Sequence, residues 1–322
     1  MVSGIQTDVL SDVFEQVEVE GVITGGFAIR GSWVSQGLVR QPFKLIALVA
    51  GSATVTAEGA DGVHGPVPLG PGDVALLNHR TRLEVRGGSP NGVPRELVPQ
   101  SSFDSAALSA ADLSRDDVLV GGAIRVHPAG RALLAAALPG LVCAKATSET
   151  GSRLASLVAQ LFEEGSSGRL GSAFAIRQNG QLLLLEFLRS YLEQEQVPTG
   201  WLRLLTDESL MPAVRLMHAE PGSRWGLAEL ASAAGMSRTV FAERFRAVAG
   251  IPPLAYLLRW RMLLAQRALH NPNTRVGTLA AELGYASESA FSNAFKREVG
   301  HSPLQHRRES GSTHRAAAST SG

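Results

Sequence analysis

Two stretches near the C-terminal end of the chain repeat one pattern of apolar and polar positions. In each, a short alanine-rich run stops at a glycine, and a serine then precedes a run with two phenylalanines four residues apart. Residues with this spacing share one face of a helix. Each stretch therefore predicts two helices joined by a tight turn, with the aromatic face packed inward. The phenylalanines are Phe241 and Phe245 in the first stretch, and Phe291 and Phe295 in the second.

The residues at the two turns support this prediction. Gly235 and Gly284 end the first helix of each pair, because glycine tolerates the left-handed backbone of a tight turn. Ser237 and Ser287 can then cap the second helix through their hydroxyls. Between the copies, residues 253–270 have helical apolar spacing and predict a connecting helix of about 27 Å. Such a helix could hold the second helices of the two pairs about one DNA turn, ~34 Å, apart, as two recognition helices in DNA would be.

This tandem helix-turn-helix arrangement resembles the DNA-binding domain of AraC/XylS-type transcriptional regulators. The resemblance is carried by residues 227–238, 255–262 and 279–297, in the family's order, over about a third of the chain. The alternative is a helical bundle that merely packs. A lone helix-turn-helix would be weak evidence against it, but a tandem pair with a connecting helix is not.

Polar residues on the second helix of each pair are the candidate DNA contacts, because they lie opposite a buried aromatic face. In the first pair, the resemblance aligns Thr239, Ala242 and Glu243 with base-reading positions. Arg238 and Arg246 are expected on phosphates.

In the second pair, Ser289, Ser292 and Asn293 match base-facing positions, and Glu288 flanks them. Lys296 is expected on a phosphate. Asn293 is the strongest single candidate, since its amide can pair with adenine through two hydrogen bonds.

Residues 6–100 differ in texture, because glycines and prolines interrupt short β-rich runs. Many short strands with glycine turns predict a small barrel or sandwich. Residues 69–79 resemble the second conserved stretch of a cupin, in which a Pro-Gly-Asp turn leads into a strand at the barrel mouth. Residues 43–53 resemble the strand and turn before it. With the C-terminal half, the chain resembles the cupin-containing subgroup of AraC-type regulators.

Enzymatic cupins hold iron or manganese through a His-x-His pair, a following Glu and a later His. Here Lys44 and Leu45 stand where histidines are expected, no acid follows at that spacing, and Arg82 replaces a histidine common in related sensors. His64 and His79 remain, and a single loop histidine is more often unliganded. We therefore expect no metal, no cofactor and no enzymatic activity. A metal-dependent cupin enzyme fused to a DNA-binding domain is the less favoured alternative.

The barrel is instead expected to hold a small-molecule effector, since the mouth of a small barrel can enclose one ligand. The candidate lining residues are Trp33, Phe43, Lys44, His79 and Arg82. Each of them could equally be a core or a surface residue. The two cations, Lys44 and Arg82, favour an anionic or carbonyl-bearing ligand.

Composition adds limits to this picture. With 44% hydrophobic and 18% charged residues, the chain is typical of globular proteins. No apolar run reaches the roughly 18 residues of a membrane span, and the N-terminus lacks the order of a signal peptide, so we expect a soluble, cytoplasmic protein without a membrane partner.

Residues 203–309 hold 14 Lys and Arg against 9 Asp and Glu, and the rest hold 16 against 20. Phosphate attraction requires such a basic segment.

The sequence thus predicts an α+β protein. A cupin-like sensing and dimerisation domain covers residues 1–200, with the barrel at about 6–127 and flanking helices at about 129–196. An all-α DNA-binding domain follows at 201–309, and 310–322 form a disordered tail. The predicted function is a sequence-specific, effector-controlled transcriptional regulator. It is expected to be a homodimer, acting on bacterial nucleoid DNA and, if an activator, with RNA polymerase. A constitutive dimeric repressor or architectural factor is the alternative.

Overall fold

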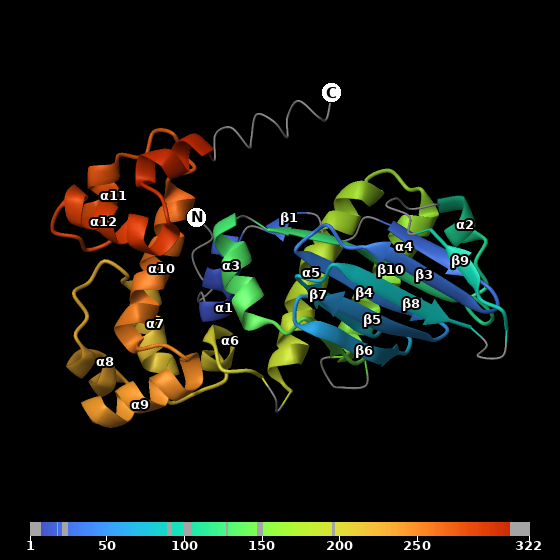
Figure 1. Cartoon of the computed structure of the whole chain (residues 1–322), viewed down its shortest axis with the longest axis horizontal. Coiled ribbons are helices and arrows are strands. Elements are labelled where there is room, and N and C mark those ends of the chain that lie inside the picture. Colours follow the sequence, from blue (N-terminus) through green and yellow to red (C-terminus); the bar gives the residue numbers. More distant parts are fainter. Residues whose placement is uncertain are drawn as a thin grey trace. The chain divides into compact units, whose positions relative to one another are not determined.

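The computed structural model describes residues 8–17, 19–20, 25–88, 92–98, 105–126, 128–146, 151–194 and 197–309, and the predicted tail lies outside them. Contacts divide the described chain into two units (Figure 1). The barrel unit lies within residues 18–198, and the helical unit lies within residues 1–17 and 199–322.

Two sheets form the barrel unit. The first has the order β1 (Val19–Glu20), β10 (Asp117–Val126), β4 (Phe43–Ala50), β7 (Val74–Asn78) and β11 (Leu141–Ala144), and β2 (Gly25–Ile29) also pairs with β10. The second has the order β6 (Gly62–Leu69), β5 (Ala53–Gly59), β8 (Arg82–Gly87), β3 (Trp33–Leu38) and β9 (Arg95–Leu97). The pairings between these described strands are antiparallel, except that of β3 with β9, which is parallel.

Alternation along the strands builds the barrel core. On β4, Ile46 and Leu48 join a buried cluster that includes Val55 and Val85 of the opposite sheet. Because side chains of a strand alternate between its faces, Phe43 lies on the other face of β4. Members from both sheets make this cluster the interior of a two-sheet barrel, as predicted.

The Pro-Gly-Asp turn is a structural clamp. Asp73 is buried, and its carboxylate accepts hydrogen bonds from the backbone N–H groups of Gly70 at 2.8 Å and Ala146 at 2.9 Å. Lys145 Nζ donates to the same carboxylate at 2.8 Å. These bonds join the turn before β7 to the segment after β11. Asp73 of the Pro-Gly-Asp turn therefore has a structural role that does not need a bound ligand.

Helices flank the first sheet: α2 (Ser105–Ser109), α3 (Pro128–Ala137), α4 (Gly151–Ser167) and α5 (Ser172–Leu192). α4 packs on α5 and contacts β2, β4 and β10. The helices predicted here are present, but β11 interrupts the segment expected to be helical and pairs with β7. Its four residues are too short to show a period. Cys143 on this strand packs against the barrel core, and burial raises the pKa of its thiol to about 11.

The helical unit contains α1 (Val9–Val17), α6 (Trp201–Leu204), α7 (Met211–Ala219), α8 (Leu227–Ala233), α9 (Arg238–Ala249), α10 (Pro253–Ala268), α11 (Val276–Glu282) and α12 (Glu288–Val299). α8 with α9, and α11 with α12, are the two predicted helix-turn-helix motifs, placed at opposite ends of α10 (Figure 1). Among the described helices, none combines the length and apolar character needed to cross a membrane.

α1 differs from the sequence prediction, which placed this segment with the barrel. Val9 and Val13, one helical turn apart, are buried. The helix contacts α7 and α10 and belongs to the helical unit. Its nine residues carry too little pattern to show which domain they cover.

Candidate functional site

Matching caps hold the two candidate recognition helices, α9 and α12. Ser237 Oγ accepts from the backbone N–H of Val240 at 3.4 Å, and Ser287 Oγ accepts from that of Ala290 at 3.1 Å. Each helix has 12 residues and ends at a left-handed glycine. The repeat in the sequence is therefore a repeat in structure.

The aromatic residues of both helices face inward. All four phenylalanines are fully buried, and within each helix the two ring centroids are 5.6 or 5.7 Å apart. On α9 the structure exposes Arg238, Thr239, Glu243 and Arg246 and leaves Ala242 half-buried. The predicted α9 residues thus lie on its outer surface.

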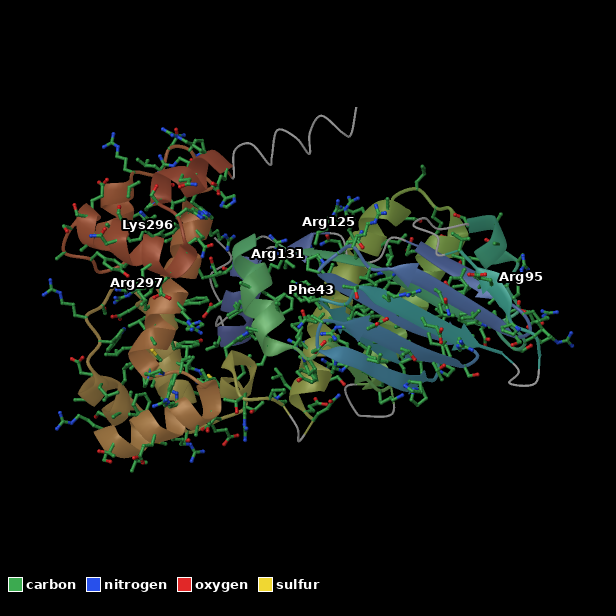
Figure 2. The ribbon with its side chains drawn as sticks, in the orientation of Figure 1. Phe43, Arg95, Arg125, Arg131, Lys296 and Arg297 are labelled. Carbon is green, nitrogen blue, oxygen red and sulfur yellow. The ribbon has the colours of Figure 1, made fainter. Side chains whose placement is uncertain are left out.

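On α12 the outer surface carries Glu288, Ser289, Asn293 and Lys296, with Ser292 half-buried. Arg297, which the sequence prediction left out, lies next to Lys296 (Figure 2); its side chain is 69% exposed, and its Nε lies 3.5 Å from the Glu298 carboxylate. Its basic charge in the last turn of α12 was the signal.

One arginine of α9 is already paired. Arg244 Nε donates to the Asp207 carboxylate at 3.0 Å. Burial raises the pKa of Asp207, but hydrogen bonds from Ser209 and Arg244 outweigh it and lower that pKa. Arg244 thus differs from Arg246, for which the structure gives no ion pair among the described residues. The first is a structural contact within the unit, and the second remains available to a phosphate.

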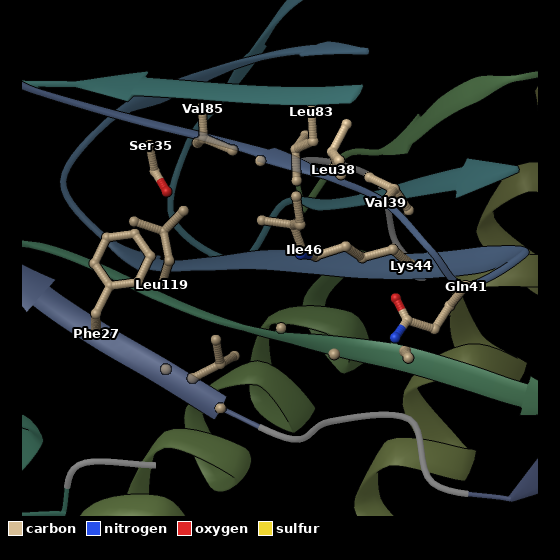
Figure 3. Close-up of a pocket in the computed structure, with 17 residues that line it drawn as sticks. Phe27, Ser35, Leu38, Val39, Gln41, Lys44, Ile46, Leu83, Val85 and Leu119 are labelled. Carbon is tan, nitrogen blue, oxygen red and sulfur yellow. The ribbon is translucent and has the colours of Figure 1, made fainter. Parts of the chain in front are cut away.

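A cavity of about 190 Å³ opens among β2, β3, β4, β8 and β10 of the barrel (Figure 3). Glycines and apolar side chains form most of its wall, and three polar side chains reach it. The lining residues used below are Phe27, Ser35, Gln41, Lys44, Ile46 and Leu119.

Of the five predicted effector residues, only Lys44 lines this cavity. Trp33 is a core residue, 1% exposed, whose indole N–H donates to Asp117 at 2.7 Å. Its ring meets Phe27 edge-on at 5.4 Å. The large aromatic residue predicted for the ligand wall instead fills the barrel interior.

The other three predicted effector residues also lie elsewhere. Phe43 precedes Lys44 on β4 and so faces away from the cavity, where it meets His79 edge-on at 5.9 Å. His79 is exposed in a turn with φ 50. Arg82 is exposed and lines a shallow outer groove with Glu58 and Glu84. Phe43 and Lys44 were both predicted to line the cavity, but successive residues of a strand face opposite sides, so only Lys44 reaches it.

The structure also places the two histidines considered as metal ligands. His64 Nε2 lies 3.1 Å from Asp61, which is ion-paired with the buried Arg80, and this pairing lowers the pKa of Asp61 to about 2. Across the described ranges, no group of three or more His, Cys, Asp and Glu is arranged to hold a metal ion.

Comparisons with known proteins cover both units. A family model described as "Cupin" matches residues 8–193, and one described as "Helix-turn-helix domain" matches residues 230–309. A putative AraC-like transcription regulator of Streptomyces lividans is 28% identical over 94% of this chain and 98% of its own length. The regulator AlkR of Acinetobacter baylyi is 29% identical over 94% of this chain and 100% of its own.

A third relative, the RCS-specific transcriptional activator RclR of Escherichia coli, is 29% identical over 82% of this chain and 95% of its own length. The order of the matched domains agrees with the two units and with the tandem motifs of the second. The chain belongs to the AraC family of DNA-binding transcriptional regulators, with a cupin domain at its N-terminal side.

Proposed function

We propose that this regulator is an activator controlled by a small-molecule effector held in the barrel cavity. The observation that carries the proposal is the cavity itself, which is lined by glycines, apolar residues and the side chain of Lys44. An effector acts only if it binds one of two arrangements of the protein more tightly than the other. Two recognition helices at the ends of α10 then supply the DNA contact.

We further propose that the protein acts as a homodimer that pairs through α5. Phe174 and Leu182 on this helix are 61% and 48% exposed, and they are eight residues apart on similar faces. Two subunits would read repeated half-sites and raise affinity through effective concentration.

The direct test is selection of genomic fragments by the purified protein, followed by footprinting at two salt concentrations. Protected half-sites that span adjacent major grooves, with one strong motif, would support sequence-specific regulation. A ligand at ~100 times its Kd would stabilise the fold by ~2.7 kcal/mol, which a thermal-shift screen can detect. Fragments without a shared motif would favour the constitutive architectural alternative.

Asn293→Ala is expected to weaken binding to the selected operator by roughly 1 to 3 kcal/mol and to change binding to random DNA little, because its amide reads a base edge. Asn293 is exposed on α12. Titration of both DNAs measures the difference. The repeat supplies a comparison in Glu243→Ala, at the equivalent position of α9. Equal losses on the two DNAs would show that Asn293 contacts the backbone.

Lys296→Ala is expected to weaken binding to all DNA alike and to reduce the salt slope by about 1, because one phosphate contact is lost. Arg246→Ala removes the equivalent residue of α9 and should behave similarly. Arg244→Ala is the matched control, since its guanidinium is paired with Asp207. A Lys296→Ala slope equal to that of the parent would exclude a phosphate contact.

A further inference from the structure

The chain uses lysine sparingly, and its three lysines lie in different surroundings. Of 30 Lys and Arg residues, only Lys44, Lys145 and Lys296 are lysines. Lys145 donates to the Asp73 carboxylate at 2.8 Å, and Lys296 is exposed on α12. Lys44 is half-buried and lines the barrel cavity beside Ile46 (Figure 3).

Among the residues that the structure describes, the cavity wall offers the Lys44 ammonium no countercharge. Its described lining residues include no Asp or Glu, and Ser35 and Gln41 are the two other polar side chains among them. Among the described residues, the structure gives the Lys44 amine no hydrogen bond and no ion pair. Burying a charge without a partner is costly, and a lysine can avoid that cost by losing its proton.

The chemistry of lysine differs here from that of arginine. Burial lowers the pKa of Lys44, so a larger fraction of its side chain is the neutral amine than for an exposed lysine. A neutral amine is a nucleophile that forms Schiff bases with carbonyl compounds. Arginine, which makes up the rest of the 30 Lys and Arg residues beside the three lysines, keeps its charge in proteins and cannot do this.

We propose that Lys44 captures a small apolar aldehyde as an imine, and that this adduct is the effector-bound state of the barrel. The inference rests on the proposed effector control and names the ligand class of that same cavity. The volume of about 190 Å³ lies below the roughly 300 Å³ at which pockets for drug-sized ligands begin, which selects short ligands. Phe27, Ile46 and Leu119 provide apolar walls for the carbon chain.

The reaction balances without an oxidant or reductant. The lone pair of Nζ attacks the carbonyl carbon, a C–N bond forms, and a proton moves from nitrogen to oxygen to give a carbinolamine. The C–O bond then breaks, and the hydroxyl group leaves with the remaining N–H proton as water. One aldehyde and one amine therefore give one imine and one water, and hydrolysis reverses the reaction.

A carboxylate ligand would require the opposite protonation state. It would pair with the ammonium form of Lys44, and the apolar surroundings disfavour that form. An aldehyde needs only the neutral amine and brings no charge into the cavity. The surroundings of Lys44 thus favour the carbonyl class over the anionic class.

Trapping the imine tests the proposal. The full chain is incubated with hexanal and sodium cyanoborohydride, and the sites of hexyl addition are mapped by peptide mass spectrometry. We expect one hexyl group on Lys44 in clear excess over Lys145 and Lys296, since burial lowers the pKa of Lys44 and so raises the fraction of its neutral amine. The two other lysines are internal controls for exposed and ion-paired amines.

Lys44→Arg and Lys44→Met should lose the adduct while circular dichroism shows the same fold. Equal addition at all three lysines, or none at Lys44 of the parent protein, would overturn the proposal. The proposal would also be overturned if hexanal did not modify the protein while hexanoate stabilised it and the Lys44 variants lost that stabilisation.

A DNA-binding titration with and without hexanal separates this inference from the proposed function. A Lys44 adduct with unchanged operator affinity would establish the imine and refute effector control through it. Control of operator affinity by another ligand, without any Lys44 adduct, would leave the proposed function standing and refute the imine.

Discussion

Gly284→Ala is expected to lower the free energy of unfolding of the helical unit by about 2 to 5 kcal/mol. Gly284 ends α11 at a φ of 81, a left-handed conformation that costs other residues roughly 1 to 2 kcal/mol. A Cβ there would also lie 2.1 Å from the backbone oxygen of Gly222, in the segment between α7 and α8. Such an overlap can be relieved only by moving backbone, which adds about 1 to 3 kcal/mol.

The repeat provides a matched control in Gly235→Ala. Gly235 has a φ of 64 in the first turn, and Met236 N–H donates to Ala231 there as Tyr285 N–H donates to Ala280 in the second, both at 2.9 Å. A Cβ on Gly235 meets no atom within 4 Å, so only the left-handed conformation costs energy, roughly 1 to 2 kcal/mol. Urea denaturation followed by circular dichroism measures both variants. Equal losses would mean that the approach of Gly222 to Gly284 is not maintained in solution.

This difference between the two glycines marks a limit of the sequence analysis. The pattern predicted both turns, because a turn made by a glycine and a following serine cap is determined by residues close together in the sequence. The buried phenylalanine pairs and the connecting helix were predicted for the same reason, since helical spacing shows which face is apolar. The contact between Gly222 and Gly284 joins residues far apart in the chain, and no local spacing records it.

The candidate ligand site was harder to predict than the DNA-binding surface. A helix exposes every residue opposite its buried face, so the polar residues of α9 and α12 were found from their spacing. A cavity in a barrel depends on which face each strand turns inward. Phe43 and Lys44 were both proposed, although neighbours on a strand face opposite ways. Alternation from Trp33 would have pointed to Ser35, which lines the cavity, while Trp33 itself fills the core.

Lowering the pH from about 7.5 to about 4 is expected to remove about 3 kcal/mol of stability from the helical unit through His218 alone. His218 is buried, stacks on Trp260 with ring centroids 3.8 Å apart, and is hydrogen-bonded to Tyr256 at 2.8 Å. Asp12 of α1 lies 3.4 Å from Nδ1 and would favour the charged ring. Burial outweighs it and lowers the pKa of His218 from 6.5 to about 4.

The sign follows from proton binding. Between pH 6.5 and about 4 the unfolded chain protonates this histidine and the folded chain does not, so acid favours unfolding. Above pH 6.5 the ring is neutral in both states, and the stabilising contribution is complete. Each pH unit within the window costs about 1.4 kcal/mol. Over the difference between the two pKa values, the loss reaches about 3 kcal/mol.

His218→Phe should flatten the pH dependence of stability, because phenylalanine can stack on Trp260 but does not titrate. Urea denaturation across this pH range measures the slope for both proteins, so any constant cost of losing the Tyr256 hydrogen bond cancels. Asp12→Asn separates the second titrating group, whose own pKa is raised by burial. Asp12→Asn should leave most of the pH dependence of stability in place, since desolvation of the His218 ring is a larger effect than its interaction with Asp12. Parallel pH profiles for the parent protein and His218→Phe would show that the ring is hydrated in the folded state, and that α1 does not exclude water from the contact of His218 with Tyr256 and Trp260 of α10.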